Sequence, residues 1–174
     1  MSMFRLSAML LAWPLFCAAA EPAGPALGQP ATPADLARWE LTIDADGRGL
    51  PEGRGGPAEG EPIYREKCEK CHGPEGRGAT AEELVGGIGS LSGDYPDRTV
   101  GSYWPYAPTI FDYIRRAMPV DAPLSLTNDE VYAVTAYLLY LNKLIPRGQT
   151  LDSTSLPLLV MPNRHGFIQV YGGG

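Results

Sequence analysis

The sequence is poor in the residues that build metal centres and disulfide frameworks, since its 174 residues include only three cysteines and two histidines. A structural zinc site uses four protein ligands, usually two C-x-x-C pairs or one such pair with two histidines. Beyond Cys68, Cys71 and His72, only Cys17 and His165 remain. We expect Cys17 to be removed with a leader segment, so the sequence argues against both a zinc site and a structural disulfide.

Long hydrophobic runs are also missing. The longest one near the start, residues 9–16, is shorter than the ~20 residues that a membrane-spanning helix needs, and no later stretch qualifies. Together with the basic Arg5 before it and the alanines at 18–20 after it, this run reads as a secretory signal peptide over residues 1–20. The sequence therefore predicts an exported, periplasmic protein without a membrane span.

Positive charge is scarce, with 14 Lys and Arg residues against 20 Asp and Glu residues and a net charge of −6. This balance argues against nucleic acid or an anionic membrane as a partner and permits docking on a basic protein surface. Residues 21–36 are rich in Pro, Ala and Gly and read as a flexible leader. We expect residues 37–174 to form one domain, with an extended segment at 37–43 and an irregular arm at 146–174.

What is present is a Cys-x-x-Cys-His motif at Cys68, Cys71 and His72. This pattern is typical of covalent haem c attachment. One helical turn brings two thiols to the two vinyl groups of a porphyrin, and the following histidine then faces the iron. A redox dithiol is the alternative, but it would need a βαβ context that the sequence does not suggest. We therefore predict one covalent haem c held by Cys68 and Cys71, with His72 on the iron.

The hydrophobic periodicity predicts an all-α domain. A first helix is expected over residues 58–70, leading into the cysteines. A second helix should begin at Thr109 and run to Arg116. The strongest signal is the capping box at residues 127–130, which opens a helix that should end near Asn142 or Lys143.

An aromatic cluster precedes the second helix. Tyr103, Trp104 and Tyr106 fall within four residues. They are candidates for packing against the haem or for contacts to its propionates, because Tyr and Trp combine a large apolar body with a polar group. Simple core packing is the alternative role for these side chains.

The sixth iron ligand has three candidates. Met118 precedes a proline in the loop before the strongest helix, and a thioether there would raise the reduction potential relative to two histidines. Met161 also precedes a proline and lies on the C-terminal arm. His165 would give a bis-histidine haem, and an open sixth position is a further alternative. We favour Met118 and keep Met161 as the alternative ligand.

Four longer strings carry a resemblance to a known family. They are residues 99–107 (TVGSYWPYA), 111–119 (FDYIRRAMP), 129–137 (DEVYAVTAY) and 161–164 (MPNR). The chain resembles, from about Trp39 to Phe167, the small cytochrome c subunits of bacterial sulfite dehydrogenases and of the sulfane dehydrogenase of the Sox sulfur-oxidation system.

This resemblance implies the class I cytochrome c fold and an iron held by His72 and most plausibly Met118. It also implies electron transfer from a molybdenum-cofactor dehydrogenase subunit to another cytochrome c or a terminal oxidase. The single Cys-x-x-Cys-His motif implies a one-haem form and no enzymatic bond chemistry of its own. Two alternatives stay open at this point, namely a generic carrier for another periplasmic dehydrogenase and a haem enzyme with an open sixth position.

Overall fold

The computed structural model describes residues 27–168 and residue 170, so the expected signal peptide lies outside the described residues. The chain divides into two units, residues 1–39 and residues 40–174. In the first unit, helix α1 spans Pro33–Trp39. The Thr32 hydroxyl accepts from the Asp35 backbone N–H at 3.2 Å, and the Asp35 carboxylate accepts from both the Thr32 N–H and hydroxyl.

This reciprocal cap, with Pro33 at the first helical position, starts a short helix where the sequence suggested a leader and an extended segment. The extended segment expected at residues 37–43 is therefore wrong over its first three residues. Residues 40–43 do lack regular secondary structure.

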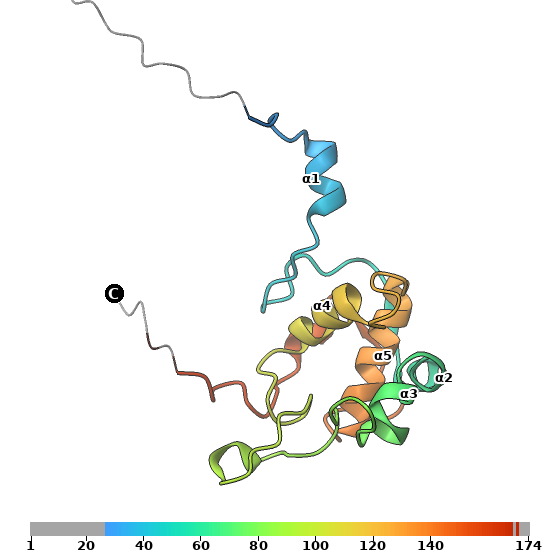
Figure 1. The fold of residues 1–174 in the computed structure, drawn as a ribbon, viewed down its shortest axis with the longest axis vertical. Coiled ribbons are helices and arrows are strands. Elements are labelled where there is room, and N and C mark those ends of the chain that lie inside the picture. Colours follow the sequence, from blue (N-terminus) through green and yellow to red (C-terminus); the bar gives the residue numbers. More distant parts are fainter. Residues whose placement is uncertain (1–26, 169, 171–174) are drawn as a thin grey trace, which may run out of the picture. The chain divides into compact units, whose positions relative to one another are not determined.

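Helix α5, Asn128–Leu141, is the centre of the second unit (Figure 1). Its residues 131–139 are all buried, so the helix is covered on every side. The predicted capping box is confirmed, because the Thr127 hydroxyl accepts from the Glu130 N–H at 3.3 Å while the Glu130 carboxylate accepts from the Thr127 N–H at 2.7 Å. The helix ends at Leu141 with Asn142 as its C-cap, close to the predicted end.

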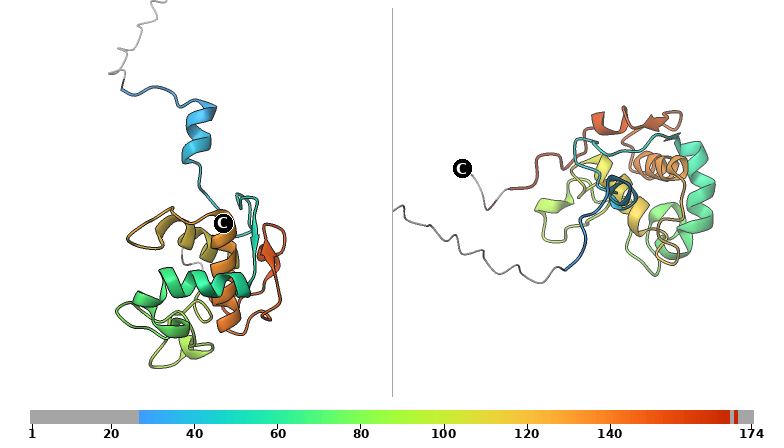
Figure 2. Two further views of the ribbon diagram at one scale, coloured as in Figure 1. Left: turned by 90° about the vertical axis from the view of Figure 1, so that its right-hand side faces the viewer. Right: turned by 90° about the horizontal axis from the view of Figure 1, so that it is seen from above.

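The first predicted helix is two helices, α2 (Pro57–Lys67) and α3 (Glu69–His72), separated at Cys68. Helix α2 crosses α5 and packs extensively against it (Figure 2). A glycine makes this close crossing feasible, because a Cβ at Gly60 would overlap the backbone carbonyl of Ala133 on α5. The position of the cysteine motif therefore depends on how α2 sits on α5.

Helix α4, Ala107–Ala117, lies on another side of α5. It begins at Ala107, two residues before the predicted start at Thr109, because a proline is tolerated within the first turn and Pro108 occupies it. Its apolar face is buried through Ile110, Phe111 and Ile114, with the Phe111 ring 4.4 Å from the Tyr132 ring of α5.

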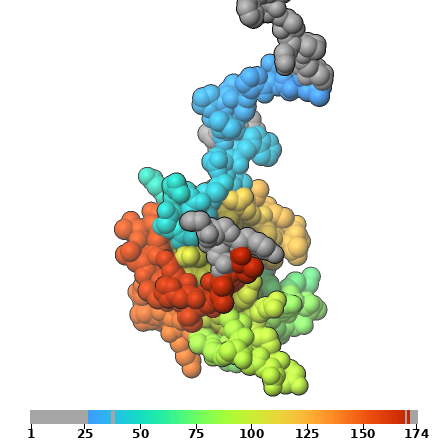
Figure 3. All heavy atoms as spheres, turned by 90° about the vertical axis from the view of Figure 1, so that its left-hand side faces the viewer, coloured from blue at the N-terminus to red at the C-terminus, as the bar shows by residue number. Residues whose placement is uncertain are grey.

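Residues 151–161 of the C-terminal arm lie against the globule (Figure 3), with Leu151, Leu156 and Met161 buried in its core. Strand β2, Leu151–Asp152, pairs antiparallel with strand β1, Arg54–Gly55. Three 3-10 helices complete the elements: η1 at Pro74–Gly76, η2 at Ser90–Ser92 and η3 at Leu156–Leu158.

The regular structure of the described residues is thus almost entirely helical, which confirms the predicted all-α class. Among these residues, none of the helices has the length and apolarity needed to cross a membrane.

Candidate haem site

The Cys-x-x-Cys-His motif forms one helical turn at the end of α2. Cys68 is the C-cap residue of α2 and the N-cap residue of α3. Its carbonyl accepts from the Cys71 N–H at 3.1 Å and from the His72 N–H at 3.0 Å. Both thiols are free and partly buried. The turn therefore presents two sulfur atoms and an imidazole within five residues, as the sequence predicted.

Neither alternative for the two thiols fits this geometry. Burial raises the pKa of the Cys68 thiol to about 11, whereas a redox-active cysteine needs a lowered pKa so that the thiolate forms at neutral pH. Among residues 27–168 and 170, no group of three or more His, Cys, Asp or Glu side chains could hold a metal ion. A porphyrin supplies four nitrogen ligands itself, so this donor set suits a haem and not a bare metal ion.

The imidazole of His72 is held from behind by a backbone carbonyl. Its Nδ1 lies 2.8 Å from the carbonyl oxygen of Glu82. Because a carbonyl can only accept, Nδ1 is the protonated nitrogen and Nε2 is left with a free lone pair. This is the tautomer that an axial histidine requires. The motif itself does not identify this acceptor, because every residue type offers a backbone carbonyl.

The loop after His72 is tied to the helix that precedes it. The buried hydroxyl of Tyr64 on α2 donates to the Gly73 carbonyl at 2.9 Å, and the Gly78 N–H donates to the His72 carbonyl at 2.8 Å. Gly73 has a positive φ of 75°, and a Cβ there would overlap the Gly78 carbonyl. This turn thus brings the chain around to the segment that contains Glu82.

The three candidates for the sixth ligand differ in burial. Met118 ends α4 and is partly exposed, with its side chain against the hydrophobic core. Met161 is only 1% exposed and belongs to the core itself. His165 is exposed on the arm. A ligand must present its donor atom on a surface that other protein atoms do not cover, and Met118 meets this condition better than Met161.

The aromatic cluster lies where the arm returns to the globule. Tyr103 is 37% exposed and packs edge-on against Phe167 at 5.3 Å, while its carbonyl accepts from the Asn163 amide at 2.7 Å. Trp104 is partly buried and packs against Tyr113 of α4 at 5.6 Å. These contacts give both aromatic side chains a packing role within the protein.

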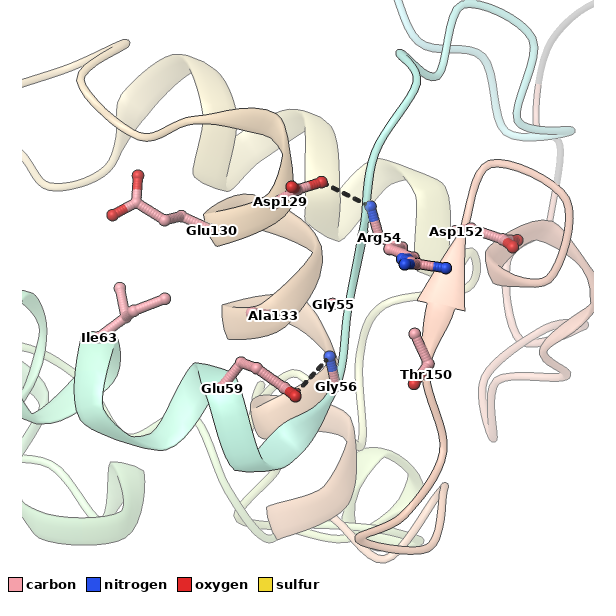
Figure 4. Close-up of a pocket in the computed structure, with 10 residues that line it drawn as sticks. All are labelled: Arg54, Gly55, Gly56, Glu59, Ile63, Asp129, Glu130, Ala133, Thr150 and Asp152. Carbon is pink, nitrogen blue, oxygen red and sulfur yellow. Dashed lines mark hydrogen bonds between the residues drawn. The ribbon is translucent and has the colours of Figure 1, made fainter.

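A surface groove of about 750 Å³ lies elsewhere (Figure 4). Four carboxylates line it, but the structure uses them locally: Asp129 accepts from the Arg54 N–H at 2.7 Å and Glu59 from the Gly56 N–H at 3.1 Å. None of the motif residues lines this groove. Its acidic residues cap and connect elements of the fold.

Comparisons with known proteins agree with this geometry. Residues 55–138 match the family model described as "Cytochrome C oxidase, cbb3-type, subunit III". A chain in the crystal structure of the sulfane dehydrogenase SoxCD from Paracoccus pantotrophus is 38% identical, with a TM-score of 0.78. That match covers 82% of this chain and 71% of the SoxCD chain. The comparison with curated proteins found no match.

The helical fold and the Cys-x-x-Cys-His turn define a c-type cytochrome. The chain belongs to the cytochrome c family, and the predicted class I fold is confirmed. It carries one covalently bound haem c and acts in electron transfer.

Proposed function

We propose that Cys68 and Cys71 form the thioether bonds to the haem, that His72 binds the iron through Nε2, and that Met118 is the sixth ligand. The observation that carries the histidine assignment is the 2.8 Å contact between His72 Nδ1 and the Glu82 carbonyl, which leaves Nε2 free. The partial exposure of Met118 at the end of α4 favours it over the buried Met161. We further propose that Tyr103 and Trp104 pack against the haem or contact its propionates.

The haem supplies reversible one-electron oxidation and reduction. The residues of the chain set how readily this occurs. Donation of the His72 Nδ1–H to a carbonyl makes the imidazole a stronger base, which favours the oxidised state, whereas a thioether from Met118 favours the reduced state. Packing of the site against the apolar core limits water access and also disfavours the extra positive charge of the ferric state.

We infer further that the electron donor is the molybdenum-cofactor subunit of a sulfite or sulfane dehydrogenase. The observation behind this inference is the 38% identity to a chain of SoxCD, together with the motif strings that run through the matched region. The acceptor would be another cytochrome c or a terminal oxidase. The signal peptide that the sequence predicts for residues 1–20 supports a periplasmic location for this transfer.

The test is to follow the reduced-haem absorption of purified, oxidised holoprotein after addition of sulfite. Sulfite alone should give no fast reduction, whereas sulfite with a purified molybdenum-cofactor subunit of a sulfite dehydrogenase should reduce the haem within the mixing time. An unrelated periplasmic dehydrogenase with its own substrate is the matched control, and it should reduce the haem at least tenfold more slowly.

Equal rates with both dehydrogenases would support a generic carrier. No reduction by either one, together with ready carbon monoxide binding to the chemically reduced protein, would contradict the carrier function and favour a haem enzyme with an open sixth position.

A further inference from the structure

The segment that holds the His72 imidazole has no regular secondary structure of its own. Residues 82–86 are neither helix nor strand, yet the Glu82 carbonyl in this segment must sit 2.8 Å from His72 Nδ1. Two backbone bonds anchor it, from the Leu84 N–H to the Gly76 carbonyl at 2.8 Å and from the Val100 N–H to the Leu84 carbonyl at 3.2 Å. The remaining anchors are side chains.

Asn142, the residue that ends α5, holds this segment at two points. Its Nδ2 donates to the Leu84 carbonyl at 3.1 Å, and its Oδ1 accepts from the Gly86 N–H at 3.1 Å. Nδ2 also donates to the Leu138 carbonyl at 2.9 Å, so the amide is tied to its own helix as well. Asn142 is only 4% exposed. The side chain therefore transfers the position of a rigid helix to an otherwise irregular loop.

The packing around Asn142 leaves the amide little freedom. A Cβ at Gly101 would overlap Asn142 Oδ1, so the glycine backbone lies directly against the amide. From the opposite side, the Thr99 hydroxyl donates to the Gly86 carbonyl at 2.7 Å and is itself almost fully buried. Gly86 is thus bonded through its N–H by Asn142 and through its carbonyl by Thr99.

We propose that Asn142 is a positioning residue for the haem ligand His72, acting through the segment 82–86, with Thr99 as its counterpart on the other side. The proposal rests on the assignment of His72 as the proximal ligand, and it is independent of which dehydrogenase supplies the electron. With the segment anchored, the Glu82 carbonyl stays close to Nδ1 and the imidazole stays strongly basic. With the anchors removed, the carbonyl moves, the bond to Nδ1 weakens, and the ferric haem loses stabilisation.

The test measures the reduction potential of the holoprotein carrying Asn142→Ala. We expect the ratio of ferric to ferrous haem at a fixed ambient potential to fall by about threefold to tenfold, where tenfold corresponds to an increase in potential of about 59 mV for a one-electron couple. We also expect faster solvent exchange of the His72 Nδ1 proton in the NMR spectrum of the reduced protein.

The matched control is Asn128→Ala at the other end of α5. Asn128 also donates its amide to a loop carbonyl, that of Glu52 at 3.1 Å, and Glu52 lies outside the segment 82–86. The control should change the thermal stability without changing the potential or the proton exchange. Since Asn142→Ala removes three buried hydrogen bonds and can impair folding, Thr99→Val provides a second perturbation of the same segment, and Thr99→Ser, which keeps the hydroxyl, should restore the wild-type values.

The proposal is overturned if Asn142→Ala and Thr99→Val lower stability while the potential and the His72 proton exchange stay at the values of the Asn128→Ala control. The spectrum of the wild-type protein tests the underlying ligation separately, because a haem without histidine ligation would be recognised there before any variant is compared.

Discussion

Replacing Met118 or Met161 by leucine, a residue of similar volume, shows which of the two sulfur atoms binds the iron. Met118→Leu removes the thioether but keeps most of the side-chain volume, so we expect a stability loss below about 1.5 kcal/mol. The iron should nevertheless lose its sulfur ligand. The expected signs are loss of the iron–sulfur charge-transfer band of the ferric protein, a lower reduction potential, and ready carbon monoxide binding in the reduced protein.

Met161→Leu is the matched variant, because Met161 is 1% exposed in the core and also precedes a proline. A volume-conserving swap there should again cost less than about 1.5 kcal/mol, while Met161→Ala should cost about 2–5 kcal/mol because it leaves a cavity. Neither change at Met161 should alter the charge-transfer band or admit carbon monoxide. The measurements are optical spectra and urea unfolding of each holoprotein.

The opposite pattern would refute the argument from burial. If Met161→Leu abolished the charge-transfer band and Met118→Leu retained it, the exposed fraction of the side chain would be a poor guide to the ligand. If His165→Ala alone changed the spectrum, the haem would instead have two histidine ligands, and the reduction potential of the wild-type protein should then be low.

Three further changes test the fold around the site. Gly60→Ala should lower the free energy of unfolding by about 1–3 kcal/mol despite the better helix propensity of alanine, because the new Cβ would overlap the Ala133 carbonyl. The control is Gly148→Ala, since a Cβ there would have no atom within 4 Å. Equal denaturation midpoints for the two variants would contradict the close crossing of α2 and α5. Burial raises the pKa of Tyr132 from 10.0 to about 12, so its contribution to stability is complete below pH 10 and is lost as the pH rises to 12. Tyr132→Phe should therefore flatten the pH dependence of the free energy of unfolding over this range, by up to about 3 kcal/mol. An unchanged slope would argue against this group. Thr127→Ala should cost about 1 kcal/mol by loss of the α5 cap, measured by urea unfolding, and a change within error would show that the cap is not used.

The features that the sequence predicted well are those that a few neighbouring residues determine. The cysteine motif specifies one turn and its chemistry by spacing alone, and the box that begins at Thr127 specifies where α5 starts. The same locality explains the error near the N-terminus. Alternation of apolar residues after residue 37 suggested extended chain, but a cap formed by Thr32 and Asp35 starts α1 upstream of that pattern.

The features that the sequence could not predict depend on contacts between distant residues. The acceptor for the His72 imidazole is a backbone carbonyl ten residues away, and any residue type at position 82 offers the same carbonyl. Asn142 was expected only as a helix end, although its amide reaches Leu84, 58 residues earlier. Hydrophobic periodicity carries no information on either contact, because both depend on how a loop without regular structure lies on the helices.

Helix α5 contacts both the helix that leads into the cysteine turn and the segment that lies beside His72. At its middle, Ala133 receives Gly60 of α2, which sets where the cysteine turn begins. At its end, Asn142 holds the segment that orients His72. In the proposed assignment, the cysteine turn and the orientation of the His72 imidazole therefore depend on one helix, even though the residues involved lie far apart in sequence. A shift of α5 would change both together, whereas the loss of one anchor changes the imidazole alone. This is why the Asn142 and Gly60 variants should separate in their effects: the first changes the potential, and the second changes mainly the stability.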